Sequence, residues 1–147
     1  MMAVNVSGRV PSGVTRRRIA DAVFAAFAVS RRKPSGAVAV RFVTDGDIAT
    51  LNRRYRGIRT PTDVLSFSAD EMPSVGHHAE REWGDIVIAS TYAGREAKRQ
   101  GVKPAEEIIR LVAHGALHLL GFDHATATAE RRMFSLQERV VGRMFRV

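Results

Sequence analysis

The sequence of 147 residues contains no cysteine, so it can form no disulfide bond, thiolate metal site or cysteine nucleophile. Any metal ion must be bound by His, Asp or Glu. A run of about 18 apolar residues, long enough to cross a membrane, is also missing, and the N-terminus lacks the apolar run of a signal peptide. We expect a cytoplasmic protein without a membrane partner. With only 10 aromatic residues, most at expected core positions, an extended base-stacking platform is not expected.

Acidic residues are scarce in the first half of the chain. Residues 1–68 contain 12 Lys or Arg and 4 Asp or Glu, whereas residues 69–147 contain 11 of each, so the net charge of +8 comes from the first half. Such an excess gives a positive potential that attracts phosphate. Solvated helix ends would give the same composition, so charge alone leaves nucleic-acid binding open.

The length and the hydrophobic content of 45% fit one domain with one core, residues 1–147. Alternation and helical spacing predict strands at residues 3–6, 37–43 and 85–89, and a Pro-containing turn leading into a strand at 60–68. Helices are predicted at 16–30, 45–54, from 91 or 92 to 100, at 104–120 and from 126 or 128 to 145. Ser90 or Thr91 is the expected cap of the third helix. We therefore predict an α+β fold with a mixed sheet of about four strands packed with several helices.

The stretch HGALHLLGFDH, residues 114–124, contains three of the five histidines. His114 and His118 are four positions apart on a predicted apolar helix, so both imidazoles can reach one ion. Gly121 allows a turn that brings His124 back toward them. Three ligands with one open position for water are typical of catalytic zinc, so we predict one zinc ion per chain. Asp123 is interpreted as a capping residue or an outer contact to a metal ligand, with a role as a fourth ligand as the alternative.

The spacing H-x3-H-x2-G-x2-H also occurs in metzincin proteases, which begin H-E-x-x-H. Position 115, where those proteases have their catalytic Glu, is Gly in this sequence. Peptide hydrolysis by their mechanism is therefore disfavoured. Glu106 and Glu107 are interpreted as helix N-terminal acids, with a distant base role as the alternative.

HGALHLLGFDH, with LNRRYRGIRTPTDVLSFS at residues 51–68 and GDIVIAS at 84–90, resembles the YbeY family of bacterial zinc-dependent endoribonucleases. This family is associated with rRNA maturation and ribosome quality control. The resemblance implies an α+β fold with a metzincin-like zinc helix, and a cleft lined by the His motif and a basic wall. His114, His118 and His124 fall on the zinc ligands, and Arg56 falls on an arginine thought to act in catalysis. Arg56 and His114 are the expected catalytic residues.

The sequence departs from the usual family pattern at Phe122, where many members have Tyr, and at Ser68, where Pro is common. The acidic stretch at residues 69–83 has no clear counterpart and is predicted to be a solvated loop. Its two histidines, His77 and His78, are interpreted as solvated residues and not as further ligands.

The motif and the resemblance together predict a zinc-dependent endoribonuclease that acts on single-stranded RNA in rRNA processing and ribosome quality control. Zinc-bound water would act on the phosphodiester, by direct attack or through the 2′-OH, and Arg56 would clamp the phosphate. RNA, as rRNA precursors, and ribosomal subunit proteins are the expected partners. Two alternatives stay open: another zinc hydrolase such as a protease, and a non-enzymatic ribosome-associated factor with structural zinc.

Overall fold

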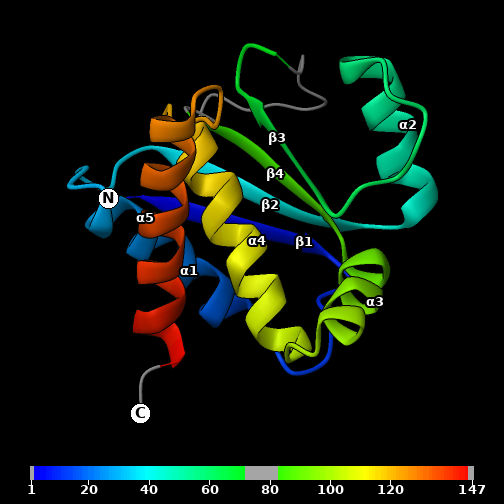
Figure 1. The fold of residues 1–147 in the computed structure, drawn as a ribbon, viewed down its shortest axis with the longest axis horizontal. Coiled ribbons are helices and arrows are strands. Elements are labelled where there is room, and N and C mark those ends of the chain that lie inside the picture. The colour runs from blue at the N-terminus through cyan, green and yellow to red at the C-terminus, as the bar shows by residue number, and fades with distance from the viewer. Residues whose placement is uncertain (1, 72–82, 146–147) are drawn as a thin grey trace.

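The computed structural model describes residues 2–71 and 83–145. These residues form one four-stranded mixed sheet and five helices, so the predicted α+β fold is confirmed (Figure 1). Most of the predicted loop at residues 69–83, with His77 and His78, lies outside the described residues.

The strands lie in the order β1-β2-β4-β3 across the sheet. β2 is parallel to both of its neighbours, and β3 is antiparallel to β4. The strand bounds are β1 Ala3–Gly8, β2 Ala37–Val43, β3 Val64–Ser68 and β4 Gly84–Ala89. The connection from β1 to β2 passes through a helix, as parallel strands require. β3 forms one edge of the sheet.

The helices are α1 Arg16–Val29, α2 Asp45–Arg56, α3 Ser90–Gln100, α4 Pro104–Leu119 and α5 Ala127–Phe145. Thr15, Thr44 and Thr126 each accept a hydrogen bond from the backbone N–H three residues later, as N-caps do. The predicted cap of α3 is wrong. Ser90 is already helical, and Ala89 occupies the N-cap without a side-chain hydrogen bond because β4 runs directly into the helix.

Both faces of the sheet are covered. β4 is buried along its whole length, because Ile86 and Ile88 face one layer of helices and Val87 faces the other. The larger core lies between the first face and α1, α4 and α5. The smaller core lies under α2, where Ile48 packs with Phe67. None of the described helices is long and apolar enough to cross a membrane.

α4 lies directly against the sheet at Gly115. A Cβ atom at this position would be 2.6 Å from Ile86 Cγ2 and 3.0 Å from Ser66 Oγ. The Ser66 hydroxyl donates a hydrogen bond to the Gly115 carbonyl over 3.2 Å. Glycine is therefore required at position 115 by the contact of α4 with β3 and β4. His114 immediately precedes Gly115 on α4.

The substitution Gly115→Ala should lower the free energy of unfolding by about 1–3 kcal/mol, because the added methyl group overpacks the contact with Ile86. The matched control is Gly142→Ala in α5, where an added Cβ meets nothing within 4 Å. It should stabilise the protein by about 0.5–1 kcal/mol through helix propensity. Urea unfolding of both variants measures the two effects. A gain of stability in both would contradict the close contact.

Candidate active site

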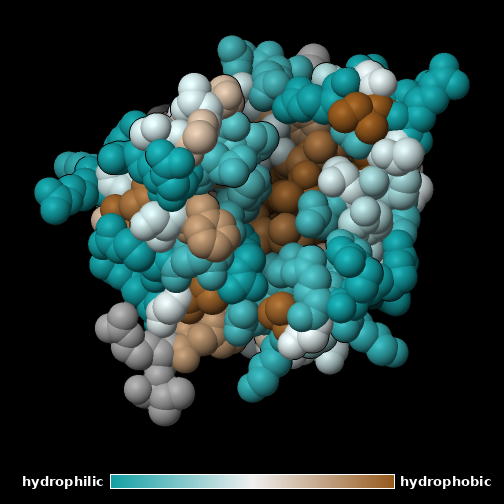
Figure 2. Space-filling model, in the orientation of Figure 1, coloured by the Kyte–Doolittle hydropathy of each residue, from teal (hydrophilic) through white to brown (hydrophobic). Residues whose placement is uncertain are grey.

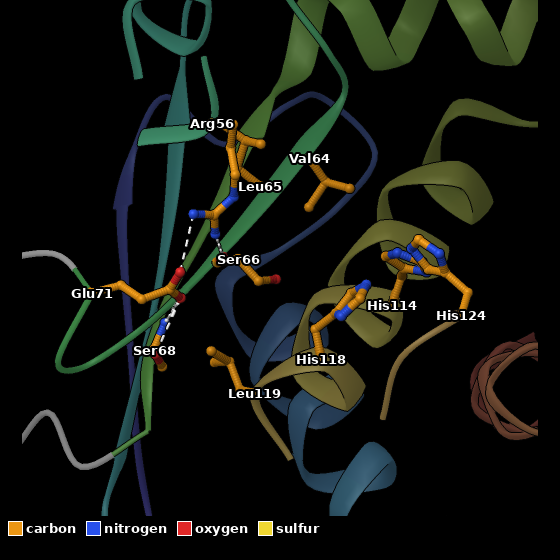
Figure 3. A pocket seen from close by; sticks show the side chains of 10 residues that line it. All are labelled: Arg56, Val64, Leu65, Ser66, Ser68, Glu71, His114, His118, Leu119 and His124. Atoms are coloured by element: carbon orange, nitrogen blue, oxygen red, sulfur yellow. Dashed lines mark hydrogen bonds and ion pairs between the residues drawn. The ribbon is translucent and has the colours of Figure 1, made fainter. Parts of the chain in front are cut away.

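Three histidines meet near the C-terminal end of α4 (Figure 3). His114 and His118 lie one helical turn apart, and Gly121, at a φ of 100°, turns the chain so that His124 comes back toward them. The ring centroids are 4.7 Å apart for His114 and His118, 5.3 Å for His118 and His124, and 6.2 Å for His114 and His124. The structure thus brings the three predicted ligands together.

The donor set fits a divalent ion such as zinc. One ring nitrogen of each histidine lies within 4.8 Å of the other two. Tetrahedral zinc requires nitrogen atoms about 3.4 Å apart, so small side-chain rotations suffice. Among the described residues, this is the one group of three such side chains close enough to hold a metal ion.

The environment also favours the neutral imidazoles that bind metal ions. Burial lowers the pKa of His118 to about 4. Repulsion that His114, His124 and Arg56 would exert on a second positive charge adds to this effect, and Asp123 opposes it. Burial likewise lowers the pKa of His114, although a hydrogen bond with Gln137 opposes it. His114 and His118 are therefore deprotonated at neutral pH.

Gln137 of α5 orients the ring of His114. Its Oε1 lies 2.9 Å from His114 Nδ1, and its Nε2 donates to Glu138 Oε2 over 3.1 Å. Because the amide nitrogen faces a carboxylate, the amide oxygen faces the ring and Nδ1 carries the proton. Nε2 of His114 is then the atom with a lone pair free for a metal ion. Such outer contacts commonly fix the tautomer of a metal-binding histidine.

Arg56 lies across from the histidines, at the C-terminal end of α2 (Figure 3). Its Nη2 donates to the Ser66 carbonyl over 2.8 Å, and its Cζ lies 4.7 Å from the centroid of the Phe67 ring. Its Nη1 forms an ion pair with Glu71 Oε1 at 3.0 Å. The guanidinium group is therefore fixed on β3 while a carboxylate occupies part of its donor edge.

Glu71 is held by the turn that follows β3. It accepts hydrogen bonds from Ser68 N over 2.8 Å and from Ser68 Oγ over 3.1 Å. Burial alone would raise the pKa of Glu71, but the hydrogen bonds from Ser68 and the contact with Arg56 lower it. Glu71 is thus ionised at neutral pH and would compete with an anion for Arg56.

The histidines, Arg56 and Glu71 line one cleft of about 430 Å³. Figure 2 shows a hollow between α4 and β3 with hydrophobic residues at its floor. Val64 and Leu119 supply apolar lining from these two elements. A cation and three imidazoles around an apolar floor suit an anion bound beside a metal ion.

Three other acids considered from the sequence do not line this cleft. Glu106 and Glu107 lie in the first turn of α4, at its opposite end, and pair with Arg110 at 3.1 Å and 3.6 Å. Asp123 accepts a hydrogen bond from Ala125 N over 3.1 Å within the turn before α5. These contacts favour helix-end and turn roles for the three acids.

The sequence interpretation missed Gln137 and Glu71. Gln137 interrupts the apolar face formed by Met133, Leu136 and Val140, and only 8% of it is exposed. A buried amide within an apolar helix face needs a hydrogen-bond partner, so the sequence pattern could have indicated a polar contact for Gln137. Glu71 carries no comparable signal, because its contact with Arg56 depends on the fold of the turn after β3.

Comparison with known proteins identifies relatives across most of the chain. Residues 10–144 match the family described as Endoribonuclease YbeY. A protein named Endoribonuclease YbeY from Persephonella marina is 44% identical over 104 residues, which cover 70% of this chain and 67% of that protein. Another of the same name from Chloroflexus aurantiacus is 35% identical over 146 residues, 95% of each chain. The solution structure of TM1509 from Thermotoga maritima shares the fold, with a TM-score of 0.63 and 24% identity over 99% of this chain and 89% of that chain.

The substitution Gln137→Met should weaken zinc binding about 10–100-fold, because it removes the acceptor that fixes the His114 tautomer while nearly preserving volume. Competition with a chromophoric chelator measures the affinity. The control is Gln100→Met on exposed α3, which should leave the affinity unchanged. Equal affinities for wild type and Gln137→Met would show that Gln137 only fills space.

Proposed function

This chain belongs to the YbeY endoribonuclease family, and we propose that it is a zinc-dependent endoribonuclease acting on single-stranded RNA in rRNA processing and ribosome quality control. The observation that carries the proposal is the meeting of three histidines that could hold a metal ion and one arginine in a single cleft. Residues 1–147 would form one metallohydrolase domain. rRNA precursors and ribosomal subunit proteins in the cytoplasm are the proposed partners.

The proposed ligands of one zinc ion per chain are His114, His118 and His124. His114 is also a proposed catalytic residue. When bound there, zinc would supply a Lewis acid that activates water near neutral pH. Three neutral imidazoles suit this role because they leave the positive charge of the ion uncompensated. Gln137 would hold the first of these ligands in the correct tautomer.

Arg56 is the proposed phosphate-binding catalytic residue. Its contacts with Ser66 and Phe67 hold the guanidinium group in place, so little conformational freedom remains to be lost when RNA binds. To hold a phosphate with two parallel hydrogen bonds from Nη1 and Nη2, Arg56 would exchange Glu71 for a phosphate oxygen at Nη1. Charge developing on the phosphate in the transition state would then lie against a fixed cation.

The protease alternative is disfavoured by the packing at Gly115. In metzincins the catalytic Glu follows the first histidine, but a side chain at position 115 would meet Ile86 and Ser66 in this fold. The acids at the start of α4 are engaged by Arg110. No described acid except Glu71 lines the cleft, and Glu71 is tied to Arg56.

The substitution His118→Ala should abolish both zinc binding and cleavage of an rRNA fragment. Arg56→Ala should lower kcat about 100-fold or more while zinc content stays at the wild-type level, because it removes charge stabilisation and not a ligand. Metal analysis and cleavage assays on the same preparations separate these two effects.

The matched control is Arg53→Ala, an exposed residue in the last turn of α2, which should leave kcat unchanged. Wild-type cleavage rates in both His118→Ala and Arg56→Ala would assign the activity to a contaminating nuclease. The non-enzymatic alternative, with zinc used only for stability, would then be favoured.

The substitution Glu71→Gln should lower KM for single-stranded RNA about threefold at low salt, because a partly exposed ion pair competing for Arg56 is removed. Zinc content should not change. Steady-state cleavage kinetics give KM and kcat, and Glu96→Gln on α3, which removes an exposed ion pair with Arg99, is the control. A fall in kcat with unchanged KM would instead assign Glu71 to the positioning of Arg56.

A further inference from the structure

A second cavity, of about 280 Å³, adjoins the cleft. Its lining residues are His114, His124, Glu130, Met133, Phe134 and Gln137. His114 and His124 also line the cleft that contains Arg56, so these two rings separate the two cavities. The remaining four residues come from α5. A molecule bound at the metal site could therefore extend past the histidines onto α5.

Phe134 gives this second cavity an exposed aromatic ring. It is 59% exposed, more than the other large hydrophobic residues exposed in the described part of the chain. A single exposed hydrophobic residue is ordinary on a protein surface. Proteins that bind single-stranded RNA stack unpaired bases on aromatic side chains, and the ring of Phe134 lines a cavity shared with two candidate metal ligands.

Glu130 determines which chemistry the cavity suits. Its carboxylate would repel a phosphate, so the cavity is unsuited to the RNA backbone itself. It can accept hydrogen bonds from an exocyclic amino group of cytosine, adenine or guanine, which uracil lacks. Both polar atoms of the Gln137 amide already form hydrogen bonds, to His114 and Glu138, so Gln137 is not assigned to base recognition.

We propose that Phe134, Met133 and Glu130 form a subsite for the base of the nucleotide next to the scissile phosphate, with a preference for bases that carry an exocyclic amino group. This inference rests on the proposed function, because the phosphate of that nucleotide would lie beside Arg56. The base would stack on Phe134 and direct its amino group at Glu130. Met133, only 2% exposed, would provide the apolar floor.

The test uses the zinc-loaded full chain and single-stranded oligocytidine and oligouridine. Phe134→Ala should raise KM for oligocytidine about tenfold with kcat changed less than twofold, because stacking contributes to binding and not to the chemical step. Zinc content and Tm should match wild type. Phe134→Trp should restore KM, and its emission should be quenched by oligocytidine, with the signal of Trp83, the only native tryptophan, subtracted.

The matched control is Phe24→Ala. Phe24 is also an exposed phenylalanine, 37% accessible, but it lies on α1 and lines neither cavity. The Phe24→Ala variant should have the wild-type KM for oligocytidine. An unchanged KM in Phe134→Ala, together with normal cleavage by wild type, would overturn the subsite and leave the proposed function standing. Absence of cleavage in wild type would instead remove the proposed function.

Base preference has its own readout. Wild type should cleave oligocytidine with a kcat/KM about fivefold above that for oligouridine, and Glu130→Gln should bring the ratio toward one. An unchanged ratio would overturn the role of Glu130. Sedimentation of wild type and Phe134→Ala tests whether a second copy of the chain, and not a base, packs on the exposed ring of Phe134. A dimer that Phe134→Ala dissociates would assign this surface to self-association and overturn the subsite.

Discussion

The contact between α4 and the sheet at Gly115 sets the positions of the two walls of the cleft relative to each other. One wall is α4, which carries His114 and His118, and the other is β3, which holds Arg56. Ser66 on β3 donates one hydrogen bond to the Gly115 carbonyl and accepts another, through its own carbonyl, from Arg56. The helix that carries two histidines and the strand that holds the arginine are therefore joined through one residue. Because Gly115 lacks a Cβ, the helix can lie close to β4, and no space remains for an acid at that position.

The histidines are also coupled to α5, through a chain of polar contacts. Gln137 connects His114 to Glu138, and Glu138 is paired with Arg110 at 2.8 Å. The hydrogen bonds that Arg110 donates to Glu138 raise the pKa of Arg110 and lower the pKa of Glu138. Such networks stabilise only when each member is satisfied, so the geometry of His114 depends on the docking of α5 on α4.

Local patterns were sufficient to predict most of the fold and the histidine cluster. The placement of His114 and His118 one helical turn apart and the turn at Gly121 follow from short-range chemistry. The contacts that refine the site could not be predicted in this way, because they join residues distant in sequence. Gln137 is 23 positions from His114, and the packing that requires glycine at position 115 involves two strands.

The two acids near the histidines restrict where a phosphate can lie. The excess of positive charge in the first half would attract the RNA backbone without selecting a base sequence, since phosphate contacts carry no sequence information. Glu71 opposes a phosphate at the Arg56 side until it is displaced, and Glu130 opposes one at the Phe134 side. In the proposed binding mode, a phosphate would therefore lie between them, against the three imidazoles and Arg56. A base would lie beyond His124, where Glu130 and the exposed ring of Phe134 line the second cavity.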